Sequence, residues 1–450
     1  MSETPPSDKP GEGGLAAPFR HPIAWRDDDF YELDKVEAEM ERVFDICHGC
    51  RRCFNLCDSF PKLFDMIDES EHEDVEHLAS EQLKPVIDAC TLCDMCFMTK
   101  CPYVPPHDFN LDFPHLMVRA RAIQHKKGET SFPDKQLAET DRNGKLFSTV
   151  PGLANIATAQ GSPLRPLVQA VAGIDKNAFL PAYADGRLSR NNALIPAPNP
   201  HAPAFGKKVV LYATCYGEFN DQTPGEAAIK LLTHNGVQVR VEHPHCCGMP
   251  KFENGDLAAV AQSAQAVSSF FAPLIDDGWD VVPLTTSCAL MLKLEWPLIT
   301  PGDAMIEKLA QATYDLSEYI VDLAKGPGLM PIDEMPSSIA VHFACHARAQ
   351  NMGAKALEML KLIPQARPQI VERCSGHGGK WGIFKGNFET ALKVGKPAAR
   401  AIEKAAPDYV VSECPLAGPH LRQVLESIDS NVTPERIGHP VELMAKAYGI

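Results

Sequence analysis

Eight cysteines in the first quarter of the chain follow two similar spacing patterns. One motif is Cys-x-x-Cys-x-x-Cys-x-x-x-Cys and the other is Cys-x-x-Cys-x-x-Cys-x-x-x-x-Cys-Pro. Three thiolates at three-residue steps let a tight loop bind three corners of one 4Fe–4S cube, and the fourth thiolate reaches the other cube. The motifs therefore predict two 4Fe–4S clusters. Cluster A is assigned Cys47, Cys50, Cys53 and Cys101, and cluster B is assigned Cys90, Cys93, Cys96 and Cys57.

Zinc is the alternative for these cysteines. Structural zinc sites use paired Cys-x-x-Cys motifs, so the third cysteine of each triplet would have no role. The extra residue in the second motif, and Asp58 where proline often follows the last cysteine, do not block ligation. Disulfides are not expected, because the chain has no secretory signal and reducing compartments keep thiols reduced. Iron–sulfur ligation is the interpretation that uses all eight residues.

The other seven cysteines follow predicted strands in two repeats. In the first repeat, an apolar run at 209–213 leads to Cys215, and a strand at 237–241 leads to the Cys246-Cys247-Gly248 turn. A helix at about 256–275 and a strand at 281–284 lead to Cys288. Gly248 is expected to let the backbone approach closely after the doublet.

The second repeat has the same order of elements. Strands at 339–343, 369–371 and 409–411 lead to Cys345, Cys374 and Cys414, with helices at 353–362 and 387–404 between them. Alternating strands and helices predict parallel sheets, whose sites form at the carboxyl ends of the strands. Each repeat should therefore gather its cysteines at one edge of its sheet.

These patterns predict an α+β multidomain protein. A helical dicluster ferredoxin-like module is followed by two tandem α/β domains, which we expect to be related by a pseudo-two-fold axis. The predicted boundaries are a disordered tail at 1–27, the ferredoxin module at 28–130, a helical linker region at 131–205, and α/β domains at 206–325 and 338–450.

The tandem cysteine repeats resemble the CCG-domain family. That family includes heterodisulfide reductase B and D subunits, glycolate oxidase iron–sulfur subunits and C subunits of anaerobic glycerol-3-phosphate dehydrogenases. The order of ferredoxin module, helical linker and two CCG halves most resembles these C subunits and covers nearly the whole chain. In the family each half ends in Cys-x-x-Cys, but Met291 and Ala417 stand at the last positions here, and Ser375 replaces the second cysteine of a doublet.

The resemblance implies two unequal CCG sites. The first site keeps four thiolates, Cys215, Cys246, Cys247 and Cys288, so one further iron–sulfur cluster is expected there. The second keeps only Cys345, Cys374 and Cys414 and is expected to bind iron weakly or not at all. His346 and His377 are candidates for its open ligand position, although a single histidine is more often hydrogen-bonded or at the surface.

Electron transfer is the predicted function, and catalytic residues are not assigned. No Gly-x-Gly-x-x-Gly fingerprint or Ser–His–Asp arrangement is evident, so the chain is not expected to oxidise a carbon substrate itself. The resemblance implies an electron-transfer subunit between a flavoprotein dehydrogenase, of the glycerol-3-phosphate or 2-hydroxy acid type, and a quinone or another acceptor. Two alternatives stay open: a CCG-type thiol/disulfide reductase, and a redox donor for a peroxide-reducing di-iron protein.

Charge and apolar patterning limit the partners and the location. With 43 basic and 58 acidic residues the net charge is −15, which disfavours nucleic-acid binding. No stretch approaches 18 consecutive apolar residues and the first residues are polar, so a cytoplasmic location is expected, with contact at the inner face of a membrane left open. Apolar residues within 147–174 predict either a dock for a membrane or partner, or packing against the CCG halves, and packing is favoured.

Overall fold

The computed structural model describes residues 18–450, which divide into two compact units at Glu129 and Thr130. The first 17 residues of the predicted disordered tail lie outside the described residues. Residues 18–27 are held in place, which differs from the expected tail. Arg20 donates to both carboxylate oxygens of Asp94 at 3.0 and 2.7 Å, and Ile23 is buried.

The first unit is helical, as expected for the cysteine-rich module. Aromatic rings form much of its core: Phe60 and Phe113 have ring centroids 4.7 Å apart, and Phe44 lies against Phe113. The elements are η1 (Asp28–Tyr31), α1 (Leu33–Cys50), α2 (Ser59–Asp68), α3 (Ser80–Ala89), the π-helical turn η2 (Cys96–Lys100) and α4 (Phe113–Lys126).

Both cysteine motifs lie where helices end and the backbone turns sharply. The first motif begins in the last turn of α1, which stops at Arg51 in the left-handed region with φ of 52°. The second motif follows α3, and Leu92 and Asp94 between its cysteines have φ of 49° and 63°. The left-handed residues thus turn the chain directly after Cys50 and on both sides of Cys93.

The second unit begins with short helices: α5 (Phe132–Leu137), α6 (Thr140–Phe147), α7 (Pro151–Thr158), α8 (Arg165–Ala172) and η3 (Leu188–Leu194). Pro151 starts α7, where its missing N–H costs nothing. The expected packing of 147–174 against the CCG halves is wrong for most of its apolar residues. Leu153, Leu164 and Leu167 are exposed, and only Phe147 among the predicted positions is partly covered.

The first CCG half has a three-stranded parallel sheet in the order β2-β1-β3. Lys208 of β1 pairs with Gln238 of β2, and Val209 pairs with Asp280 of β3. Its elements are β1 (Lys208–Tyr212), α9 (Thr214–Phe219), α10 (Thr223–His234), β2 (Gln238–Glu242), α11 (Met249–Phe252), α12 (Leu257–Asp276) and β3 (Asp280–Pro283). They are followed by α13 (Thr286–Leu290), η4 (Met291–Glu295), α14 (Trp296–Ile299), α15 (Ala304–Gln311) and α16 (Leu316–Lys325).

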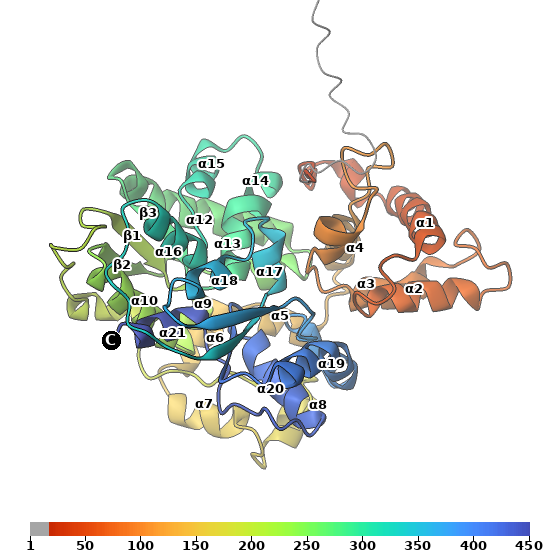
Figure 1. The fold of residues 1–450 in the computed structure, drawn as a ribbon. Coiled ribbons are helices and arrows are strands. Elements are labelled where there is room, and N and C mark those ends of the chain that lie inside the picture. The colour runs from red at the N-terminus through yellow and green to blue at the C-terminus, as the bar shows by residue number, and fades with distance from the viewer. Residues whose placement is uncertain (1–17) are drawn as a thin grey trace, which may run out of the picture. The chain divides into compact units, whose positions relative to one another are not determined.

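The second CCG half repeats this topology, with parallel strands in the order β5-β4-β6. It is the blue-green to dark blue part of the ribbon in Figure 1. Ser338 of β4 pairs with Arg367 of β5, and Ile339 pairs with Tyr409 of β6. Its elements are β4 (Ser338–His342), α17 (Cys345–Ala349), α18 (Lys355–Leu360), β5 (Arg367–Val371), η5 (Trp381–Ile383), α19 (Phe388–Ala405), β6 (Tyr409–Ser412), α20 (Ala417–Ser427) and α21 (Pro440–Ala447).

One apolar core joins the two halves. It contains Val209 and Leu211 of β1 together with Ile339 and Val341 of β4. The last helix of each half packs on the other half: α16 lies against α18, and α21 lies against α10. The halves are therefore parts of one folded unit.

By length and composition alone, α12 is the one helix among residues 18–450 that is long and apolar enough to cross a membrane. In the structure it packs against α11, α15 and β3 within the first CCG half. It buries Val260, Ala264, Val267 and Phe271. This packing accounts for its apolar face.

Candidate metal centres

Four cysteines from both motifs line one cavity of the first unit. The cavity is partly open to solvent and is bounded by Cys47, Cys50, Cys53 and Cys101 and by aromatic residues that include Phe60 and Phe64. Burial and the neighbouring Cys101 raise the pKa of Cys53 to about 12. The structure thus brings together the four residues assigned to cluster A.

The other four cysteines lie together in a second group. Burial, and then Cys93 and Cys90, raise the pKa of Cys57. Burial raises the pKa of Cys96 too, with Cys93, Cys90, Cys57 and Cys53 as its charged neighbours. The fourth cysteine of the first motif therefore faces the second motif, as the exchanged assignment requires. Because the charge of Cys53 also acts on Cys96, the two cysteine groups are neighbours in the first unit.

The surroundings of both groups suit iron–sulfur ligation. Backbone N–H groups of Ser59 and Phe60 point at the Cys57 sulfur, and those of Tyr103 and Val104 point at Cys101. Such donors stabilise sulfur-centred negative charge. Among residues 18–450, no group of three or more His, Cys, Asp or Glu side chains is placed closely enough to hold a single metal ion.

Arg121 is a supporting residue that the cysteine spacing does not predict. Its guanidinium donates to the backbone carbonyls of Ile87 and Cys90, the first at 2.6 Å. These contacts fasten the start of the second motif to α4. In the sequence, Arg121 stands out only by its position on a predicted helix after the second motif. That position does not distinguish a buried, hydrogen-bonded arginine from a solvent-exposed one.

The four cysteines of the first CCG half form a continuous row of thiols. The Cys288 Sγ lies 3.0 Å from the Cys247 Sγ, and Cys246 is in hydrogen-bonding contact with both Cys247 and Cys215. Cys246, Cys247 and Cys288 are buried. Hydrogen bonds from Cys215 and Cys247 hold the pKa of Cys246 well below its usual range. Soft thiolates gathered in this way suit an iron–sulfur cluster.

Buried aromatic side chains hold the loop that carries the doublet. The Tyr212 hydroxyl donates to the His245 carbonyl at 2.6 Å, and the Trp296 indole N–H donates to the Cys247 carbonyl at 3.1 Å. Gly248 has φ of 84°, in the left-handed region, and its N–H donates to the Cys246 sulfur at 3.4 Å. The left-handed φ is the reason for glycine at this position. Close approach of neighbouring backbone, which was expected, is not the reason, because an added Cβ would make only ordinary contacts at 3.4 Å or more.

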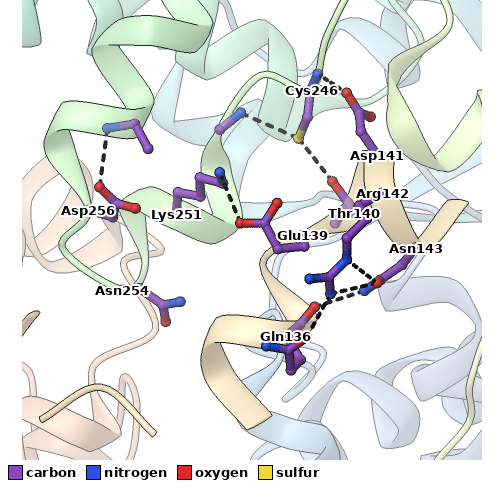
Figure 2. A network of polar contacts seen from close by, with 12 residues as sticks. Gln136, Glu139, Thr140, Asp141, Arg142, Asn143, Cys246, Lys251, Asn254 and Asp256 are labelled. Carbon is purple, nitrogen blue, oxygen red and sulfur yellow. Dashed lines mark hydrogen bonds and ion pairs between the residues drawn. The ribbon is translucent and has the colours of Figure 1, made fainter. Parts of the chain in front are cut away.

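Helix α6 of the linker region reaches the same doublet, as Figure 2 shows. The Thr140 hydroxyl donates to the Cys246 sulfur at 3.2 Å. Asp141 accepts from the Cys246 backbone N–H at 2.8 Å and also lies 2.8 Å from Nε2 of His243. No pattern in the sequence predicts these contacts, because the two residues stand about a hundred positions before the cysteine they contact.

The three cysteines of the second CCG half are not gathered in the same way. Burial, then Glu413, and then Cys288 of the first half raise the pKa of Cys414, so Cys414 and Cys288 lie within electrostatic reach of each other. Cys345 begins α17, which packs against α13, the helix that carries Cys288. Cys374 is exposed, and its sulfur accepts from the Gly376 N–H at 3.3 Å. The elements that carry Cys345 and Cys288 therefore meet between the two halves.

The candidate histidine ligands have other neighbours. Nδ1 of His346 is 2.8 Å from the Ser287 hydroxyl, a contact that links the two halves. The His377 ring lies 5.7 Å from that of His420, and Nε2 of each is buried without a hydrogen-bond partner. Burial lowers the pKa of His420 to about 4. The cysteine pattern does not single out His420, which lies on α20 six residues after Cys414.

Both α/β halves match the model of one family, the cysteine-rich CCG domain, over residues 209–293 and 339–422. The chain thus carries two CCG domains. It is homologous to the C subunit of the anaerobic glycerol-3-phosphate dehydrogenase of Escherichia coli K12, with 26% identity over 340 residues that cover 74% of this chain and 81% of the relative.

Two further proteins are similar to this chain. Lactate utilization protein A of Geobacillus kaustophilus is 27% identical over 254 residues, which cover 53% of this chain and 95% of the relative. An uncharacterized iron–sulfur protein of Methanocaldococcus jannaschii is 29% identical over 229 residues, covering 50% of this chain and 43% of that protein. The chain is thus related to a subunit of an oxidoreductase and to a protein named for its iron–sulfur content.

Proposed function

We propose that this chain is an electron-transfer subunit of an oxidoreductase complex. Two adjoining cysteine groups in the first unit, and the row of four thiols in the first CCG half, are the observation that supports this. Cysteines 47, 50, 53 and 101 would hold cluster A, and cysteines 57, 90, 93 and 96 would hold cluster B. Cysteines 215, 246, 247 and 288 would hold a further cluster. When bound, a 4Fe–4S cluster accepts and releases one electron at a time.

The protein's part in this function is to hold each cluster and adjust its potential. Burial of Cys90 and Cys96 limits access of water to cluster B. Peptide N–H groups and the Thr140 hydroxyl place positive dipole ends at the sulfurs, which favours the more reduced, more negative state. The net charge of −15 acts in the opposite direction and lowers the potentials.

The partners belong to the proposal as well. The glycerol-3-phosphate dehydrogenase relative suggests a flavoprotein dehydrogenase, of the glycerol-3-phosphate or 2-hydroxy acid type, as electron donor. A quinone or another carrier would accept the electrons. We propose a cytoplasmic location, with contact at the inner face of the membrane.

The test is anaerobic purification of the tagged full chain from its native cells, followed by identification of co-purifying proteins and by metal analysis. About twelve irons and twelve acid-labile sulfides per chain are expected for three clusters. A co-purifying flavoprotein should bleach the cluster absorbance when its substrate is added. Stoichiometric zinc with little iron, or clusters that no partner reduces, would contradict the proposal.

A thiol/disulfide reductase remains the second candidate, because Cys247 and Cys288 form a close dithiol pair. Both side chains are buried, which limits access of a bulky disulfide substrate. The isolated chain, reduced by an artificial donor, would be assayed with a heterodisulfide. Turnover that Cys288→Ser abolishes would favour this candidate over electron transfer.

A further inference from the structure

Two short helices of the linker region carry an unusual apolar surface. The most exposed side chains are Leu153, with 72% of its surface exposed, Val171 with 66% and Leu167 with 61%. We use the name hairpin surface for the outward apolar residues of α7, α8 and their flanks: Val150, Leu153, Ile156, Leu164, Leu167 and Val171. Six exposed large apolar residues within 22 positions of two neighbouring helices are more than the single exposed apolar residues normal at a protein surface.

The hairpin surface is not the packing face of these helices. On α7, Asn155 is hydrogen-bonded in both directions to the backbone of Tyr183, at 2.9 and 2.8 Å. On α8, Val168 and Ala172 pack on a small core that contains Phe388 of the second CCG half. The inward-facing side chains of α7 and α8 therefore already have hydrogen-bond and packing partners. A helix at a soluble surface places polar residues outward, and α7 and α8 place leucine, isoleucine and valine there.

Exposed charge is absent from residues 147–173. The only ionisable side chain in that stretch is Arg165, which is 2% exposed. Its guanidinium is enclosed by four backbone carbonyls, those of Thr158, Lys176, Asp175 and Ala178, at 2.9, 3.1, 2.7 and 2.6 Å. The arginine thus braces the turn between α7 and the segment after α8, and its charge does not reach the surface.

Basic side chains flank the uncharged stretch. Lys145 in the last turn of α6 and Lys176 after α8 are both exposed, and Asp175, the one acidic residue directly beside the stretch, is half-buried. The chain as a whole carries a net charge of −15 and is repelled by an anionic surface in most orientations. An uncharged apolar face bordered by lysines is the arrangement by which amphipathic helices lie in the interface of anionic bilayers. Interfaces between proteins usually have a polar rim with charged partners.

We propose that the hairpin surface inserts into the interface of an anionic phospholipid bilayer. Leu153 and Leu167 would enter the acyl boundary, while Lys145 and Lys176 would meet the lipid phosphates. The inference deepens the membrane contact that is part of the proposed function by naming its residues. It does not depend on electron transfer, so each can fail without the other.

The experiment is flotation of the full chain with vesicles of phosphatidylglycerol or of phosphatidylcholine. Wild-type protein should bind the first and bind the second weakly. Leu153→Glu/Leu167→Glu should lower binding by about tenfold or more, because it removes two inserting leucines and adds charge. Leu362→Glu/Ile370→Glu, which changes two exposed apolar residues of the second CCG half, is the matched control and should bind like wild type.

A second variant separates lipid charge from apolar insertion. Lys145→Glu/Lys176→Glu should remove the preference for phosphatidylglycerol, and high salt should weaken wild-type binding in the same direction. Unchanged thermal unfolding would show that the variants fold. Failure of the wild type to float with anionic vesicles would overturn the proposal. Equal binding by the leucine variant, or docking of a protein partner on this surface without any vesicle binding, would also overturn it.

Discussion

The ligand groups of the first unit show how far residue spacing alone predicts a metal centre. Three cysteines at three-residue steps can bind only on one short loop, so the triplets can be assigned without knowledge of the fold. The exchange of Cys57 and Cys101 is also predictable, and the structure places each beside the other motif. Thr140, Asp141 and Trp296 could not be predicted, because their contacts with the doublet arise only from tertiary packing.

Exchange of the fourth ligands gives the first prediction. Cys57→Ser should damage cluster B, the cluster otherwise held by Cys90, Cys93 and Cys96, because its sulfur lies in that group. Electron paramagnetic resonance of the reduced protein should therefore lose the same signal in Cys57→Ser and in Cys90→Ser. Cys47→Ser is the control and should lose the other signal. If Cys57→Ser resembles Cys47→Ser instead, the assignment is wrong.

The hydroxyl of Thr140 gives a prediction about potential. Thr140→Val removes a donor to the Cys246 sulfur while keeping the shape of the side chain. The midpoint potential of the cluster in the first CCG half should fall, by roughly 40 mV if the hydrogen bond contributes about 1 kcal/mol to the reduced state. Redox titration followed by electron paramagnetic resonance measures this shift.

Thr140→Ser is the matched control, since it keeps the hydroxyl and should restore most of the wild-type potential. The two clusters of the first unit provide an internal reference, because Thr140 lies outside both cysteine groups. A merely structural role for Thr140 would leave the potential of loaded protein unchanged in both variants. A rise in potential in Thr140→Val would contradict the assignment of the hydroxyl as a donor.

At the scale of elements, the strands are more predictable than the helices. The strands β1, β3, β4 and β6 are short, mostly apolar runs, whereas β2 and β5 also carry polar residues; all six lie within two residues of their predicted places. Of the short helices from α13 to α16, α13 and α14 have only five and four residues, too few to show a helical period. Helices α15 and α16 are amphipathic and begin after the N-cap residues Asp303 and Asp315, so the sequence does carry signals for them. The pattern of 147–174 indicates amphipathic helices but cannot show which face is covered.

Arg165 carries a prediction about the linker helices. Arg165→Met keeps much of the apolar stem but leaves four backbone carbonyls without their donor, one in a buried hydrogen bond and three in partly buried ones. The free energy of unfolding should fall by about 1–3 kcal/mol, because the buried acceptor bears its desolvation penalty while the partly buried ones remain near water. Chemical denaturation would measure this loss.

Arg400→Met is the control for that variant, because Arg400 lies exposed on α19. Its effect on the free energy of unfolding should stay within about 0.5 kcal/mol. Hydrogen exchange should rise in Arg165→Met around residues 158–178 before it rises in the CCG sheets. Equal stability of the two variants would show that the carbonyls find water instead.

At the scale of the whole second unit, reciprocal packing of the two CCG halves matters most. Helix α16 of the first half covers α18, and α21 of the second half covers α10, so each half completes the core of the other. The equal strand orders show that the two halves share one topology, and the pseudo-two-fold axis between them stays a prediction. The sequence repeat indicates two similar halves, but it cannot indicate which cysteines the packing brings together. That depends on how the edge with Cys288 meets α17.

The last prediction concerns iron content in the unequal halves. Cys246→Ser/Cys247→Ser should lose about four irons per chain, because it removes the centre of the row of four thiols. Cys374→Ser should lose none, since Cys374 is exposed. Cys414→Ser tests whether the halves share one site, because Cys414 lies within electrostatic reach of Cys288. Loss of the same cluster in Cys414→Ser and in the doublet variant would show a shared site. If Cys374→Ser alone lost iron, the second CCG half would hold the cluster, which would contradict the proposal that the half with four cysteines holds it.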